Sequence, residues 1–154
     1  AVPLMSAAGF RDITRVRIAI EGTAAALTAE AATPAALADI AACEAAFRIL
    51  SRSKNPDLIQ SVRFNQAFHF ALYRAAGSTE LLAIIERLWL KVGPIINFDL
   101  RGSPERLRFG GAVRYHAAIL EAVRNRDPEA ARAALAADIQ GAAEYILSQG
   151  HLPD

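Results

Sequence analysis

The sequence predicts an all-α domain, and two observations lead to this prediction. Alanine is abundant, and glycine falls mostly at predicted helix ends and in loops. Apolar residues recur at three- and four-residue intervals over long stretches, which short clusters of helix-breaking residues separate. A chain of 154 residues has the length of one domain with a single substantial core.

The first half of the chain predicts an arm followed by three helices. Residues 1–10 contain proline and glycine without a periodic pattern, so we expect a linker or arm there. Apolar stripes then predict helices over residues 11–31, 34–50 and 57–76. Thr33 and Asp57 are of the residue types that cap a helix N-terminus, and Pro34 suits the first helical position, where its missing N–H costs nothing.

The second half predicts three more helices and a tail, over residues 79–93, 104–125, 128–149 and 151–154. Ser78 or Thr79 caps the first of these helices. Gly93-Pro94 is expected to end or kink it, with residues 95–101 as a displaced continuation. The next helix is expected to loosen at Gly110-Gly111. The domain proper is therefore predicted over residues 11–150.

Charge and cysteine content exclude several classes of protein. Seventeen Lys and Arg against sixteen Asp and Glu leave a formal charge of +1 without a dense basic block, so this segment is not expected to neutralise DNA phosphates itself. Cys43 is the only cysteine, and we expect a buried structural thiol and no disulfide. No charge-free run of about 18 apolar residues and no signal peptide occur, so a soluble cytoplasmic protein without a membrane partner is expected.

Motifs of common enzyme classes are missing from the sequence. It has no glycine-rich phosphate loop after a strand, no His-Glu-x-x-His, no Cys-x-x-Cys and no nucleophile elbow. We therefore predict that the chain is not an enzyme. It begins with Ala1 and not with Met, which hints at a fragment of a longer protein, although a trimmed chain would begin in the same way.

Four polar side chains fall on or beside the apolar faces of three predicted helices. Asn65 and His69 lie one helical turn apart, so a carbonyl oxygen and an imidazole nitrogen can reach the same point. His116 shares the apolar stripe of its helix, and Asp138 flanks the stripe of the last helix. This pattern favours a helical bundle with a small polar chamber. It fits a metal site, and it also fits the commoner case of buried histidines hydrogen-bonded to carboxylates.

Three further residues have both a structural and a functional interpretation. Arg17 and Glu21 are spaced for an i,i+4 salt bridge on the first helix, and they are also placed to meet a ligand at the edge of its apolar stripe. Trp89 is most simply a core aromatic residue, and in a pocket it would stack on a ligand.

Four motifs follow one another along the chain, and together they resemble a known family. They are Arg17-x-x-Ile20-Glu21, then Asn65-x-x-Phe68-His69-x-x-Leu72 leading to Ala75-Ala76-Gly77-Ser78, then Tyr115-His116-x-x-Ile119 with Ala122-Val123, and Asp127-x-x-x-Ala131-x-x-x-Leu135-x-x-Asp138-Ile139. Their order and spacing resemble the FCD domain, the ligand-binding C-terminal domain of FadR-type regulators in the GntR family of bacterial transcription factors. The likeness runs from Arg11 to about Leu147.

The resemblance implies an antiparallel bundle of six or seven helices around a central chamber. In many members the chamber holds a divalent metal bound by an acidic residue or Asn four residues before a His, and by two further His, with a small carboxylate effector completing the coordination. Asn65, His69 and His116 match these positions, while Asp138 stands where His is usual and Asn65 where Asp is usual. This set remains suited to Zn²⁺, Mn²⁺ or Ni²⁺. Arg17 matches the family's first-helix Arg, whose guanidinium could clamp a carboxylate.

The resemblance also implies partners. A winged helix-turn-helix precedes the FCD domain in the family, so residues 1–10 would be the end of an interdomain linker. The expected function is to sense a small organic acid and change the affinity of a homodimer for operator DNA, which the other domain binds. Three alternatives remain open: a metal-free effector pocket, a metal-dependent hydrolase or lyase with Glu21 as general base, and a plain helical dimerisation module.

Overall fold

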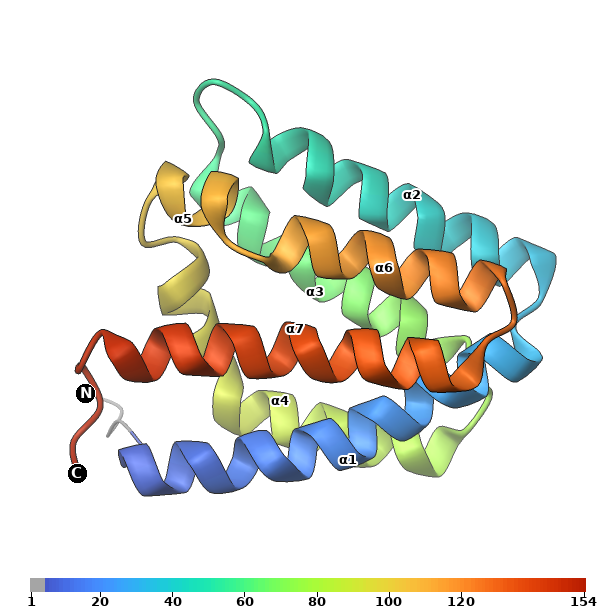
Figure 1. Cartoon of the computed structure of the whole chain (residues 1–154), viewed down its shortest axis with the longest axis horizontal. Helices are drawn as coiled ribbons and strands as arrows, with labels where there is room; N and C mark the ends of the chain where they lie inside the picture. Colours follow the sequence, from blue (N-terminus) through green and yellow to red (C-terminus); the bar gives the residue numbers. More distant parts are fainter. Residues whose placement is uncertain (1–4) are drawn as a thin grey trace.

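Seven α-helices form the part of the chain that the computed structural model describes, residues 5–154 (Figure 1). They are α1 (Ala7–Ala31), α2 (Pro34–Ser51), α3 (Leu58–Arg74), α4 (Thr79–Leu100), α5 (Pro104–Phe109), α6 (Ala112–Arg124) and α7 (Pro128–Ser148). The predicted all-α class and the predicted number of six to seven helices are confirmed. The linker expected at residues 1–10 falls partly on residues 1–4, which lie outside the described residues.

The predicted capping residues begin their helices. Thr33 Oγ1 accepts a hydrogen bond of 3.1 Å from the backbone N–H of Ala36, with Pro34 at the start of α2. Asp57 accepts from the second and third N–H groups of α3, and Ser78 caps α4. Such caps satisfy backbone donors that have no partner inside the helix, and each contributes about 1 kcal/mol.

The first helix begins earlier than predicted. The expectation that residues up to Phe10 are irregular is wrong for Ala7–Phe10, which form the first turn of α1. Ser6 caps this turn by accepting a hydrogen bond of 3.0 Å from Gly9, and Phe10 is only 1% exposed. Burial of an aromatic ring at the helix start outweighs the absence of a longer periodic pattern.

The fourth helix is predicted to end or kink at Gly93-Pro94. It does not end there, because α4 continues through Pro94 to Leu100. A proline inside a helix removes one backbone hydrogen bond and can kink the helix without ending it. Val92, Ile95 and Ile96 are all buried on either side of Pro94. Their packing keeps this segment helical, since tertiary contacts supply most helical stability in proteins.

The predicted loosening at Gly110-Gly111 is a complete break between α5 and α6. Gly110 has an extended backbone (φ −72°, ψ 162°). A Cβ atom at Gly110 would lie 2.4 Å from the carbonyl oxygen of Arg106, and one at Gly111 would lie 2.6 Å from the Tyr115 ring. Glycine is thus required at both positions for this close approach.

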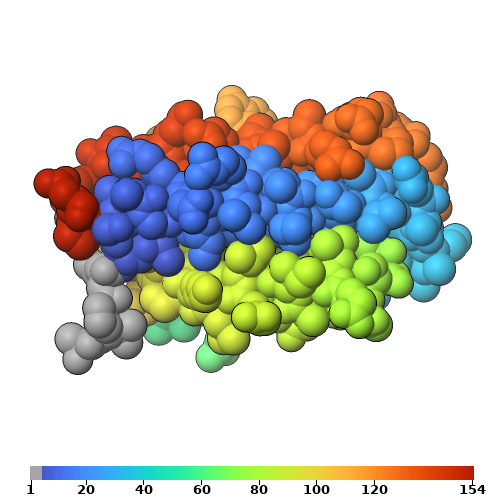
Figure 2. All heavy atoms as spheres, turned by 90° about the horizontal axis from the view of Figure 1, so that it is seen from below, coloured from blue at the N-terminus to red at the C-terminus, as the bar shows by residue number. Residues whose placement is uncertain are grey.

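Neighbouring helices in the bundle run antiparallel (Figure 1). The most extensive helix pair is α1 with α7, followed by α6 with α7 and α2 with α3. Figure 2 shows α1 lying between α4 and α7 along the length of the molecule, with the C-terminal tail beside the start of α1. A hydrogen bond of 2.7 Å from the backbone N–H of Ala7 to the carbonyl of Pro153 joins these two ends.

Two apolar clusters fill the bundle. One contains Phe68, Trp89 and Ile139, and the other contains Phe10 and Phe47 among its members. Cys43 is half-buried against the first cluster and not fully buried as predicted. Within residues 5–154, no helix is both long enough and apolar enough to span a membrane. His116 lies where the two clusters meet, because each cluster supplies one of the two phenyl rings that contact it.

Candidate metal centre and chamber

Three side chains from three helices converge in the interior. His69 comes from α3, His116 from α6 and Asp138 from α7, and all three are buried. Asp138 Oδ2 lies 3.1 Å from His69 Nε2 and 3.5 Å from His116 Nε2. One ligand atom from each residue lies within 4.8 Å of the other two.

These separations fit one metal ion. With metal–ligand bonds of about 2.0–2.1 Å, two ligands of a tetrahedral ion stand about 3.3–3.4 Å apart. The two distances from Asp138 Oδ2 fall on either side of this value. The widest pair, up to 4.8 Å apart, would have to close by about 1.4 Å to reach this tetrahedral spacing.

The surroundings of His116 suit a metal ligand. Its ring stacks on Phe68 with centroids 4.2 Å apart, and the Phe47 ring lies 4.8 Å away. Neither ring nitrogen has a hydrogen-bond partner among residues 5–154, because the 3.5 Å separation of Nε2 from Asp138 Oδ2 is too long for a good bond. A buried polar group without a partner costs about 1–3 kcal/mol, which coordination of a metal would offset.

Protonation states at the site suit a cation. Burial is the largest influence on the pKa of His116 and lowers it from 6.5, although Asp138 acts in the opposite direction. Burial by itself would raise the pKa of Asp138, but the adjacent His116 and His69 hold it well below its ordinary value. A neutral imidazole and an ionised carboxylate are the forms that bind metals.

Asn65 lies on the same wall as this group. It precedes His69 by one turn of α3, is 6% exposed and lines the chamber with His69 and Asp138. Its side chain makes no hydrogen bond within the described part of the chain, so its amide oxygen is free to act as a fourth ligand. The structure thus brings His69, His116 and Asp138 within 4.8 Å of one another and places Asn65 in the chamber wall, and the assignment of the four as metal ligands stays a prediction.

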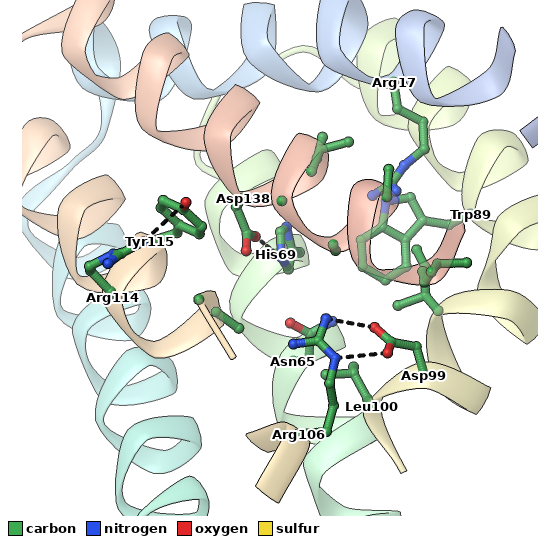
Figure 3. Close-up of a pocket in the computed structure, with 18 of the residues that line it drawn as sticks. Arg17, Asn65, His69, Trp89, Asp99, Leu100, Arg106, Arg114, Tyr115 and Asp138 are labelled. Atoms are coloured by element: carbon green, nitrogen blue, oxygen red, sulfur yellow. Dashed lines mark hydrogen bonds and ion pairs between the residues drawn. The ribbon is translucent and has the colours of Figure 1, made fainter. Parts of the chain in front are cut away.

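The chamber itself has a volume of about 180 Å³ (Figure 3). Helices α1, α3, α4, α5, α6 and α7 all contribute to its walls. Charged side chains face it from several sides: Arg17, Asp99, Arg106, Arg114 and Asp138. Asp99 and Arg106 form a pair with two hydrogen bonds of 2.8 and 2.9 Å that joins α4 to α5. His116 and Glu21 lie behind the wall and do not line the chamber.

Arg17 and Glu21 form the i,i+4 salt bridge that the spacing predicted. Arg17 Nε donates to Glu21 Oε2 at 2.6 Å, and Arg17 Nη2 donates to Oε1 at 3.2 Å. Within residues 5–154 the third nitrogen, Nη1, has no acceptor, and Arg17 lines the chamber. Burial by itself would lower the pKa of Arg17, but Glu21 outweighs it and raises that pKa. The guanidinium is therefore charged, and it keeps N–H groups for a ligand.

Glu21 is a fully buried carboxylate with four donors around it. Besides the two from Arg17, Oε1 accepts hydrogen bonds from the hydroxyl of Tyr73 at 2.5 Å and from the indole N–H of Trp89 at 2.9 Å. Trp89 is a core residue, as its simplest interpretation predicted, and its ring also lines the chamber. Burial, followed by the negative charge of Glu21, raises the pKa of Tyr73 well above 10, so the phenol keeps its proton.

Comparison with known proteins assigns this architecture. The model of the FCD domain family matches residues 12–141, which is most of the chain. The chain belongs to the FCD domain family. This FCD domain is 29% identical over 140 residues to the HTH-type transcriptional regulator McbR of Escherichia coli (strain K12), and the match covers 90% of this chain and 62% of that regulator.

The fold agrees with the same relative. The solved structure of E. coli McbR/YncC superposes with a TM-score of 0.80 and 26% identity, over 90% of this chain and 68% of that one. The predicted FCD-like bundle is confirmed. The relative is named a transcriptional regulator, which agrees with the prediction that this chain is a regulator domain and not an enzyme.

Several residues of the site were not predicted. Tyr73 follows His69 by four residues, so helical spacing could have placed it beside the imidazole. Asp99 and Arg106 meet across the turn between α4 and α5, where no periodic pattern relates them. Tyr115, which lines the chamber, stood in a motif only as the neighbour of His116.

Proposed function

We propose that this FCD domain binds a small organic acid at a divalent metal held by His69, His116, Asp138 and Asn65, and that binding changes how a homodimeric regulator holds its operator. The observation that carries this proposal is the buried His/His/Asp group, whose ligand atoms lie within 4.8 Å of one another beside a chamber. Zn²⁺, Mn²⁺ or Ni²⁺ suits this set of nitrogen and oxygen ligands.

The charges of the site favour an anionic effector. Arg17 and Glu21 neutralise each other, and an imidazole binds a metal in its neutral form. A divalent ion with one carboxylate, from Asp138, keeps a net charge of +1, which a carboxylate of the effector would balance. Arg17 Nη1 and the exposed Arg114, which has no salt-bridge partner within residues 5–154, supply further N–H donors along the chamber wall.

The volume of the chamber favours a small molecule. At about 30 Å³ for each water, 180 Å³ holds roughly six water molecules. That is room for an organic acid of a few carbons and not for a long chain. Trp89 provides a flat apolar surface against which such a molecule can pack.

The response to the effector would pass through α7. This helix carries Asp138 at the site, and the segment that follows it ends at Pro153, whose carbonyl accepts the N–H of Ala7 at the start of α1. On the family resemblance, we expect a winged helix-turn-helix before α1. A shift of α7 on effector binding would therefore move the attachment point of the DNA-binding domain, and a coupling of about 1–3 kcal/mol suffices for regulation.

The homodimer is proposed to form through α4. Ile84, Leu90 and Phe98 are large apolar side chains of this helix, and they are 45%, 79% and 58% exposed. Exposed apolar residues gathered on one element mark protein–protein contacts. Operator DNA and the DNA-binding domain belong to the whole regulator, which we expect to act in the cytoplasm.

Two measurements test the proposal. Metal analysis of the purified protein by ICP-MS should find close to one divalent ion per chain, and His69→Ala should lose it. His151→Ala is the matched control, because His151 is exposed in the C-terminal tail. A thermal-shift screen of organic acids should then find ligands whose stabilising effect disappears with a chelator. Blank results in both measurements would refute the proposal.

A metal-free effector pocket is the second candidate. It is favoured by the Arg17 Nη1 donors and by Arg114, which can bind a carboxylate without an ion. Ligand stabilisation that persists in the presence of a chelator would support it. A hydrolase or lyase with Glu21 as general base is disfavoured, because that carboxylate already accepts four hydrogen bonds and lies behind the wall.

A further inference from the structure

We infer that Tyr73 and Glu21 are positioning residues for the metal centre, which fix His69 in the one tautomer that presents Nε2 to the ion. This inference rests on the proposed metal-dependent function and extends it to two residues that do not touch the metal. It starts from a chain of hydrogen bonds that leads from α1 to α3 and ends at the site.

The direction of each hydrogen bond in this chain is determined. Glu21 is a carboxylate and can only accept, so the hydroxyl of Tyr73, 2.5 Å from Oε1, must donate to it. That hydroxyl has one proton, so toward His69 Nδ1, 3.0 Å away, its oxygen can only accept. His69 Nδ1 therefore carries a hydrogen.

The opposite tautomer is unfavourable while Tyr73 is present. If Nδ1 carried no hydrogen, Tyr73 would have to donate to it, and two oxygens without a proton between them would face each other at 2.5 Å. With Nδ1 protonated, the neutral imidazole directs the lone pair of Nε2 toward Asp138 Oδ2, 3.1 Å away. Two acceptors at this distance repel each other, and a cation between them turns the repulsion into coordination.

The remaining partners of Glu21 explain why the carboxylate cannot turn away. Arg17 holds it through two nitrogens and Trp89 through its indole N–H. The Trp89 ring also lies against His69, with ring centroids 5.3 Å apart. The same carboxylate thus orients a metal ligand through Tyr73 and holds two residues of the chamber wall.

Tyr73→Phe tests the inference, because it removes one hydroxyl and keeps the buried ring. Tyr145→Phe is the matched control, since this tyrosine is 40% exposed and does not line the chamber. Affinity for Zn²⁺ is measured by competition with a chromogenic chelator. We expect Tyr73→Phe to bind Zn²⁺ about 10- to 100-fold more weakly than the wild type, and the control to bind it equally well.

A second readout does not depend on metal. Long-range ¹H–¹⁵N spectra of the metal-free protein report which nitrogen of each of its three histidines carries a hydrogen. At a pH above the imidazole range, wild-type His69 should show a protonated Nδ1. In Tyr73→Phe the hydrogen should move to Nε2, where Asp138 accepts it. A wild-type His69 with an unprotonated Nδ1 would overturn the inference.

The two readouts separate this inference from the function on which it rests. Wild-type protein that binds no metal but shows the Nδ1–H tautomer would remove the metal function and confirm only that Tyr73 fixes the tautomer of His69. A lower melting temperature of Tyr73→Phe with unchanged Zn²⁺ affinity and unchanged tautomer would show a purely structural hydroxyl, and the inference would be wrong.

Discussion

The buried pair of Arg17 and Glu21 gives the sharpest prediction about stability. Glu21→Gln keeps the shape of the side chain but removes its charge, and it places an amide N–H₂ where one oxygen now accepts from Arg17. The guanidinium, whose side chain is 6% exposed, then remains in the interior without a counter-charge. Removal of one partner of a buried ion pair typically costs 3–5 kcal/mol.

This magnitude is a large part of the stability of a domain, which is typically about 5–15 kcal/mol. For a chain of this size each kcal/mol moves the melting temperature by about 2–4 °C, so we expect Glu21→Gln to melt roughly 6–20 °C lower. Urea unfolding followed by circular dichroism at pH 7 measures the free energy directly. The double variant Glu21→Gln with Arg17→Met should recover much of the loss, because it leaves no unpaired charge.

The same helix offers a control for this experiment. Arg15 and Asp12 form an ion pair of 2.8 Å whose side chains are 80% and 67% exposed. Exposed pairs contribute about 0–1 kcal/mol, so Asp12→Asn should change stability little. If Glu21→Gln lost less than about 1 kcal/mol of stability, a buried and unpaired Arg17 would not cost the roughly 3–5 kcal/mol expected here. A double variant no more stable than Glu21→Gln would refute the unpaired-charge explanation.

Three further predictions concern the metal ligands and the dimer. The pKa of His116 is lowered by folding, so just below pH 6.5 the unfolded chain binds more protons than the folded one. The stability of the metal-free protein should therefore fall as the pH drops below that value. His116→Leu should flatten this part of the pH profile and abolish metal binding. Asn65→Asp should tighten Zn²⁺ binding in chelator competition, and it should destabilise the metal-free protein because a second carboxylate then lies near Asp138. Weaker Zn²⁺ binding would exclude position 65 from the coordination sphere. Leu90→Glu should shift the mass found by light scattering from dimer to monomer, and a dimer unchanged by this substitution would place the interface away from α4.

Much of the fold could be predicted from sequence because its signals are local. Thr33, Asp57 and Ser78 cap the helices that their residue types predicted, and the paired glycines at 110 and 111 separate two helices. Pro94 shows where local signals fail, because the packing of its neighbours keeps α4 helical through a residue that usually disrupts helices. The early start of α1 has the same cause, since the burial of Phe10 depends on contacts with distant parts of the chain.

The candidate site was predictable only in part, for a related reason. Periodicity placed Asn65, His69 and His116 toward the interior, and the structure agrees. Spacing along one helix could not show that Tyr73 and Trp89 meet Glu21, because these contacts span 52 and 68 residues of sequence. Contacts between residues one turn apart on a helix can be predicted from a sequence. Hydrogen bonds between helices cannot, because they depend on the angles at which the helices pack.

Glu21 and Asp138 are buried carboxylates with different surroundings, and we expect different chemical roles for them. Glu21 is 0% exposed and accepts four hydrogen bonds, so it has no strong affinity left for an ion, and changes to it act on the stability of the fold. Asp138 lies beside two imidazoles, one of which lacks any hydrogen-bond partner in the described chain, and its oxygen keeps lone pairs for a cation. Only a measurement of metal or effector binding tests whether Asp138 is a ligand and Glu21 its support.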